Sequence, residues 1–219
     1  LVPCVHFYDQ DFVDMYDRTW VWIEENWIQK SDDGMFANGY FVGSDSDVID
    51  MFDSCLTAIS LSYSNQNFDA YSLIDFFYRM QQEDGRICER YKAGTYEPVL
   101  TEDNPKGVCP PLLPYVEYLF YHKIGNKKRL KEVVPFLEKY FGFLVAEYQC
   151  PNGLFHVPFS ACRLGNVPRL NAYYTIDFNA MMALAALYMS NIGDILNDKE
   201  LSFRYKRIYF SLKTRINSM

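Results

Sequence analysis

The sequence predicts an all-α protein built from helix pairs in two layers. Apolar residues recur with the 3.6-residue period of helices along most of the chain, and no segment alternates convincingly as a strand. In addition, segments that are apolar on nearly every face alternate with segments that carry a single apolar stripe. We expect the first kind to form an inner layer of helices and the second kind to cover it.

Three helices are expected in the first part of the chain. The first, over 11–29, has one apolar stripe and charged residues elsewhere. The second, over 47–62, is apolar on most faces and follows a Ser44-x-x-Asp47 capping pattern. The third, over 68–82, mixes aromatic rings with charged residues.

Four more helices are expected in the remainder. The fourth, over 110–125, begins at a proline pair that suits a first turn and ends at a glycine. The fifth, over 127–148, contains Pro135, which is expected to kink or break it. The sixth, over 175–191, is the most apolar, and the seventh, over 198–216, sets an apolar stripe against Lys and Arg.

The helices that are apolar all round recur at a nearly constant distance. They start near positions 47, 110 and 175, so they are 63 and 65 residues apart. A period of this size predicts a repeat of helix hairpins within one domain over 1–219. From the residues alone, a closed toroid and a curved solenoid fit equally well.

Composition excludes some partners. The net charge is -7 and no basic stripe stands out, which argues against nucleic acid. The longest strongly apolar stretch, 181–189, is too short to span a bilayer, so no membrane partner is expected. The six cysteines lack metal-ligand spacing and predict mostly free thiols in a cytoplasmic protein without metal or cofactor.

The connections between helices differ in character. Those that lead into the apolar helices, over 31–46, 84–109 and 149–174, are long and rich in polar residues, Gly and Pro. The opposite connections are short. Because long loops at one end of a rigid scaffold commonly carry function, we expect the site there. The 17% of aromatic residues fits either a large core or a pocket whose rings pack on sugar faces.

Four motif groups occur in a fixed order along the chain. The first two are Met51-Phe52-Asp53-Ser54 and 81–87, which contains an Asp-Gly pair. The third is Cys109-Pro110-Pro111, and the fourth joins Asn152-Gly153-Leu154 to Asn166-Val167-Pro168-Arg169 and 174–179. In this order they resemble the catalytic (α/α)6 domain of glycoside hydrolase family 63 and its bacterial relatives, which include mannosylglycerate hydrolases.

The resemblance implies a six-hairpin, (α/α)6 toroid. The family domain has twelve helices, so about seven would make this chain the N-terminal part of a longer catalytic domain. It further implies action on small α-glucosides, α-mannosides or oligosaccharides with inversion, for which a general acid and a base stand roughly 6.5–9.5 Å apart. The family's acid position holds Gly165, which cannot transfer a proton, and the base would lie beyond the matched helices.

The resemblance also selects candidate site residues. The carboxylates that are candidates to replace the missing acid are Asp177, Glu89 and Glu97. Candidates for binding a carbohydrate ligand are Asp53, Phe52, Tyr91, Cys109, His156, Asn166 and Arg169. Each also has an ordinary structural role open to it, such as a helix cap for Asp177 or an ion-pair partner for Arg169.

Three functions remain open. One is a glycosidase-derived domain that is inactive without the rest of its toroid. Another is a non-catalytic glycan-binding or scaffold protein, which Gly165 favours. The third is a helical repeat protein without any link to sugars. We also expect exposed apolar surface on the last two helices, to be covered by a homo-oligomer or by a continuation of the chain.

Overall fold

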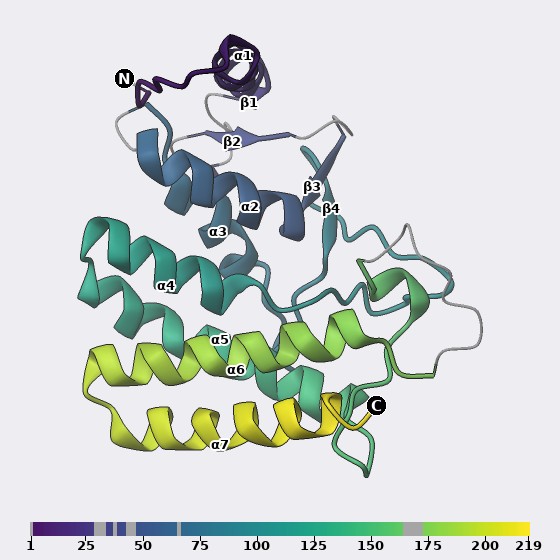
Figure 1. The fold of residues 1–219 in the computed structure, drawn as a ribbon. Helices are drawn as coiled ribbons and strands as arrows, with labels where there is room; N and C mark the ends of the chain where they lie inside the picture. Colours follow the sequence, from purple (N-terminus) through teal and green to yellow (C-terminus); the bar gives the residue numbers. More distant parts are fainter. Residues whose placement is uncertain (1, 29–33, 37–38, 43–46, 65–66, 164–172) are drawn as a thin grey trace.

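The computed structural model describes residues 2–28, 34–36, 39–42, 47–64, 67–163 and 173–219 (Figure 1). Within these residues the fold is mostly helical, as predicted. The helices are α1 (Gln10–Glu25), α2 (Met51–Leu61), α3 (Ala70–Arg79), α4 (Leu113–Ile124), α5 (Lys127–Tyr148), α6 (Ile176–Leu196) and α7 (Lys199–Ile216). The strands are β1 (Trp27–Ile28), β2 (Tyr40–Phe41), β3 (Val48–Asp50) and β4 (Arg90–Lys92).

The expectation of a chain without strands is wrong. β1 pairs with β2, and β3 pairs with β4 so that Ile49 lies opposite Tyr91, both pairs antiparallel. These strands are two or three residues long, too short for an alternating pattern to show in the sequence. The consequence is that 48–50, expected to be helical, is extended.

α2 begins at Met51 because of the residue before it. The Asp50 side chain accepts hydrogen bonds from the backbone N–H of Phe52 (2.8 Å) and Asp53 (3.1 Å), which satisfies two donors of the first turn. The helix start expected at Asp47 was therefore too early. Ser44 of the expected capping pattern lies outside the described residues.

α5 is continuous through Pro135, which corrects the expected kink or break. Pro135 lies on the exposed side of the helix, away from the core. The opposite side is held in the core by a buried stripe of Leu130, Val134, Leu137, Phe141 and Leu144.

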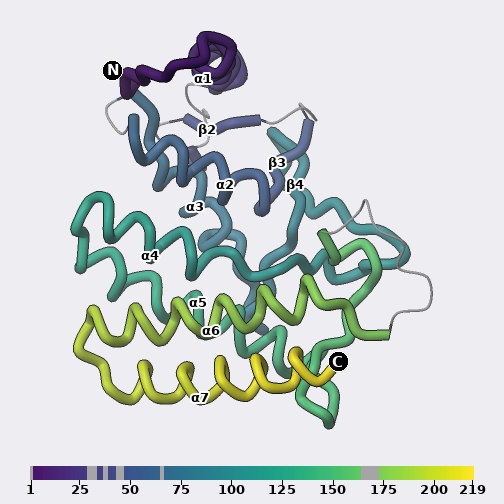
Figure 2. The backbone as a smooth tube through the Cα atoms, in the orientation of Figure 1, coloured from purple at the N-terminus to yellow at the C-terminus, as the bar shows by residue number. Residues whose placement is uncertain are grey.

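The helices form the two layers that the periodicity predicts (Figures 1 and 2). α4 packs between α2 and α6, so the three apolar helices lie side by side, with α3 and α5 behind them and α7 alongside α6 at the end of the row. The stack has two open ends, with α1 beyond one and α7 at the other. This arrangement is compatible with a helical toroid-like fold. Among the described residues, no helix is long and apolar enough to cross a membrane.

Candidate functional site

Two of the long connections meet on the side of the molecule where α6 begins (Figure 1). The backbone N–H of Ser160 donates to Asp103 Oδ2 at 2.9 Å, which ties the loop before α6 to the loop before α4. Between them, next to the β3–β4 pair, lies a pocket of about 310 Å³. It is lined by Asp50, Glu89, Arg90, Val99, Thr101, Asn104, Gly107, Ser160 and Arg163.

Arg163, one of the lining residues, makes contacts with several elements around this pocket. Its guanidinium forms ion pairs with Glu89 and, at 3.5 Å, with Asp50. The same group lies over the Phe52 ring, 4.6 Å from the centroid. Its backbone N–H donates to Asp177 Oδ2 at 2.8 Å. Arg163 thus connects the loop before α6 with the first turns of both α2 and α6.

The carboxylates of the pocket are positioned by backbone hydrogen bonds. The β3–β4 register places Asp50 opposite Arg90, and their side chains form an ion pair at 3.7 Å. The Glu89 carbonyl accepts from Met51 N at 2.8 Å, and Glu89 N donates to the Gly107 carbonyl at 2.6 Å. Glu89 is therefore fixed both to the start of α2 and to the loop that precedes α4.

Burial dominates the electrostatics of the site. Glu89 is only 7% exposed, and this desolvation raises its pKa to about 7, with the nearby Asp50 carboxylate acting in the same direction and Arg163 and Arg90 opposing it. Burial and the Asp50 charge also raise the pKa of Asp53. A carboxyl group with a near-neutral pKa is able to donate a proton at physiological pH.

Several of the candidate residues come together here. The Phe52 ring contacts the Arg163 guanidinium, and Glu89 and Asp177 both bind Arg163. The charges of Asp50 and Arg163 also act on the Asp53 carboxylate. Cys109 is completely buried, and burial followed by the Glu89 carboxylate raises the pKa of its thiol.

The other candidates lie elsewhere. Tyr91 is a core residue, 1% exposed, whose hydroxyl accepts from Cys88 N at 3.0 Å. Glu97 is exposed and pairs with Lys92 at 3.3 Å. His156 is stacked on Tyr173, with ring centroids 3.8 Å apart. Gly165, Asn166 and Arg169 lie outside the described residues.

Sequence reasoning missed Asp50, Arg90 and Arg163. Asp50 was overlooked because its segment was expected to lie inside a helix, where it would not cap one. Arg90 depends on the same strand pair. Arg163 stands two residues before Gly165, the position of the family's acid. This proximity was the one signal in the sequence that pointed to Arg163 as a site residue.

No family model matches this chain. An uncharacterized protein of Borreliella burgdorferi is 38% identical over 220 residues, which cover 100% of this chain and 46% of that protein. The chain therefore spans about half the length of this curated relative.

Three solved structures share the fold. A sialidase has a TM-score of 0.68 at 15% identity, covering 97% of this chain and 19% of that one. The glycoside hydrolase family 63 mannosylglycerate hydrolase from Thermus thermophilus, in complex with glucose, has a TM-score of 0.61 at 12% identity, covering 82% and 61%. An uncharacterized conserved protein from the same organism has a TM-score of 0.58 at 12% identity, covering 78% and 56%. At these identities the likeness concerns the fold alone, and the chain has a glycosidase-like helical fold.

Proposed function

We propose that this chain is a glycosidase-like domain that binds a carbohydrate in the pocket around Arg163. The observation that carries the proposal is the cluster of Asp50, Glu89, Arg90 and Arg163 at the loop end of a fold shared with a mannosylglycerate hydrolase. Small-ligand sites combine concavity with a few convergent polar groups, and the volume of about 310 Å³ stands at the small end of such sites.

The side chains of the pocket suit sugar hydroxyls. Carboxylates accept hydrogen bonds from hydroxyl groups, and guanidinium groups donate them in a fixed planar geometry. Arg163 Nε is buried and has no hydrogen-bond partner among the described residues, so this donor is available to a ligand that reaches it. Phe52, half-buried and stacked against the Arg163 guanidinium, adds an apolar ring next to the pocket.

In this proposal Glu89 is the proton donor of a hydrolytic reaction. It replaces the acid that the Gly165 position lacks, because its raised pKa keeps a substantial protonated fraction near neutral pH. The base that activates water for inversion would come from the rest of a longer catalytic domain. The 219-residue chain alone should then bind sugars without hydrolysing them. The substrate class that we propose is small α-glucosides, α-mannosides or oligosaccharides.

A non-catalytic glycan-binding role is the second candidate. It is favoured by the ion pair between Glu89 and Arg163, because a carboxylate held by a guanidinium resists protonation. The two functions share the binding pocket and differ in whether Glu89 transfers a proton.

Binding is tested by saturation-transfer NMR of the 219-residue chain with glucose, mannose and α-linked disaccharides. We expect transfer to at least one of these sugars, and its loss in Arg163→Gln. The matched control is Glu97→Gln, which changes an exposed carboxylate outside the pocket. Equal binding by all variants, or no binding by a folded wild type, would contradict the proposal.

Catalysis is tested in a longer protein that contains this domain, by anomer-resolved NMR of α-glucoside hydrolysis. Glu89→Gln should lower kcat by about 10²–10⁴-fold on alkyl glycosides. The loss should shrink on aryl glycosides with acidic phenol leaving groups, since these depart without protonation. A uniform loss on both substrates assigns Glu89 a structural role, and sugar binding without hydrolysis supports the second candidate.

A further inference from the structure

α1 lacks a packing partner along most of its length. Of its 16 residues, all of which the structure describes, Ile23 alone is buried. An isolated helix of about this length is only marginally stable in water. Phe12 (54%), Met15 (58%) and Trp22 (44%) are exposed on α1, although the Trp22 ring also contacts Phe41.

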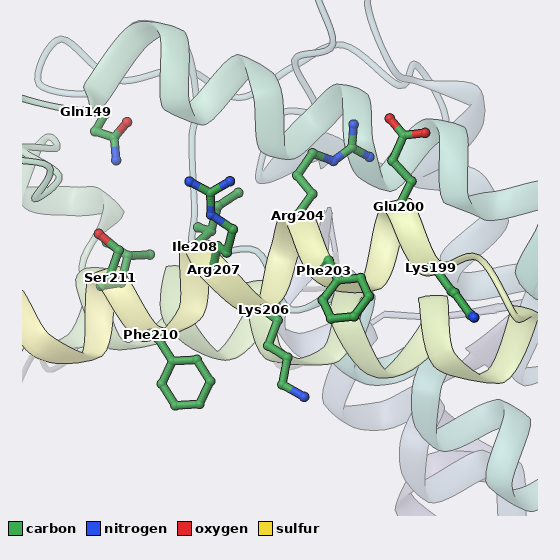
Figure 3. A pocket seen from close by; sticks show the side chains of 11 residues that line it. Gln149, Lys199, Glu200, Phe203, Arg204, Lys206, Arg207, Ile208, Phe210 and Ser211 are labelled. Carbon is green, nitrogen blue, oxygen red and sulfur yellow. The ribbon is translucent and has the colours of Figure 1, made fainter.

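The opposite end of the molecule has a second uncovered face. A shallow groove of about 1000 Å³ runs along the outer side of α7 (Figure 3). Phe203 and Phe210, 65% and 52% exposed, project from α7 together with Lys206 on its uncovered side. Large exposed rings at helical spacing mark a surface that another element covers.

These two faces carry opposite charge, although the whole chain is acidic. α1 holds five acidic residues and one basic residue, whereas α7 holds six basic residues and one acidic residue. A second shallow groove lies along α1, where Asp11, Asp14 and Arg18 line it beside Met15, and the groove along α7 is lined by Lys206 and Arg207 as well as Phe210. Each surface therefore combines exposed apolar side chains with charges, and the excess charge is negative on α1 and positive on α7. The two surfaces are complementary in apolar character and in charge.

We propose that the occupant of each face is a second copy of this chain. α1 and α7 lie at opposite ends of the stack, so one molecule cannot bring its own two faces together (Figure 1). The arrangement in this proposal is two-fold, with α1 of each copy on α7 of the other. This forms two identical contacts and leaves neither face uncovered, which closes the assembly as a dimer. Like-charge pairing of α7 with α7 is disfavoured.

The oligomeric state of the 219-residue chain tests this inference, by light scattering after gel filtration over a hundredfold range of concentration. We expect a species of twice 25.7 kDa whose dissociation constant rises at least about tenfold in high salt, because exposed charges are screened. A monomer at every concentration would overturn the proposal, as would an open polymer that grows without limit.

Charge reversal identifies the surfaces. Lys206→Glu with Arg207→Glu, or Asp11→Lys with Asp14→Lys, should each weaken the dimer by at least about tenfold. Combining both pairs in one chain should restore dimerisation, because α1 is then basic and α7 acidic at these positions and the two surfaces again carry opposite charge. The matched control is Lys128→Glu with Lys131→Glu on exposed positions of α5, which should leave the dimer unchanged.

Two further results would overturn the inference. One is a dimer that none of these reversals weakens. The other is a monomer that associates only with the part of the Borreliella burgdorferi relative that this chain does not cover, which would show that the faces belong to a longer protein.

Discussion

At the scale of single residues, the most concentrated polar interactions lie inside the core and away from the pocket. Glu117 is 0% exposed and accepts hydrogen bonds from Arg129 Nε (2.8 Å), Arg129 Nη2 (2.7 Å) and the Tyr78 hydroxyl (3.0 Å). Asp75 pairs with the same guanidinium at 2.9 Å. A buried charge requires such compensation, so this network fixes α3, α4 and α5 relative to one another.

Replacing one partner should expose this dependence. Arg129→Met leaves the Glu117 carboxylate buried without its counter-ion, and we expect it to lower the free energy of unfolding by about 3–5 kcal/mol. Urea denaturation followed by circular dichroism measures the change. Lys128→Met, at the exposed neighbouring position, should change the free energy by less than about 0.5 kcal/mol. A loss below about 1 kcal/mol in Arg129→Met would show that the network is dispensable.

Glu89 should give the protein a characteristic pH dependence. Burial raises its pKa from 4.5 to about 7 in the folded chain, so between these values the folded state holds a proton that the unfolded state has lost. Stability should therefore fall as pH rises through this window, by up to about 3 kcal/mol. The difference between wild type and Glu89→Gln in urea denaturation isolates this contribution. Glu97→Gln is the exposed control, and a difference that stays constant with pH would exclude the raised pKa.

At the scale of secondary-structure elements, the closest approach is between α6 and α7. A Cβ atom on Gly193 would lie 2.6 Å from Ser202 N and 2.9 Å from Ser202 Cα, so only glycine permits these backbones to come together. The hydroxyl of Ser202 also donates to Asp194 Oδ1 at 2.6 Å beside this contact. The last helix pair is therefore held by backbone proximity as well as by side chains.

A pair of glycine substitutions tests this contact. Gly193→Ala should lower the free energy of unfolding by about 1–3 kcal/mol, because α6 and α7 must separate to admit the methyl group. Gly142→Ala, in α5, meets no atom within 4 Å and should raise it by about 0.5–1 kcal/mol through helix propensity. Thermal and urea unfolding of the two variants measure both effects. Equal changes in the two variants would contradict the role of the close contact.

The elements differ in how far sequence predicts them. α5 was predicted at its observed bounds because its apolar stripe persists over about six turns, and α7 was predicted to within one residue. The start of α6 was predicted equally well, but the helix continues beyond its predicted end at 191 to Leu196. β3 and β4 were missed because three residues carry no measurable period. The residues of the site were predictable to a similar extent. Glu89 and Asp53 were selected from the sequence, whereas the role of Arg163 depends on contacts between segments that are distant in the sequence.

At the scale of the whole molecule, the layers predict a gradient of local stability. The helices α2, α4 and α6 share the core, whereas α1 contributes one buried residue. In native-state hydrogen exchange, amides of α4 and α6 should exchange only through global unfolding, and those of α1 at least about a hundredfold faster. Dimerisation through α1 should slow this exchange as concentration increases. Uniform protection of α1 and α6 in dilute solution would contradict the gradient.

The placement of the tryptophans has a practical consequence for following all of these equilibria. Trp20, Trp22 and Trp27 are the three tryptophans of the sequence, and they lie at the end of α1 and in β1. Trp20 and Trp27 pack on Phe68, and Trp22 contacts Phe41. Intrinsic fluorescence is therefore a local optical reporter of how the N-terminal helix sits on the stack. A melting curve recorded by emission should precede one recorded by ellipticity, and the interval between them measures how independently that end of the molecule comes apart.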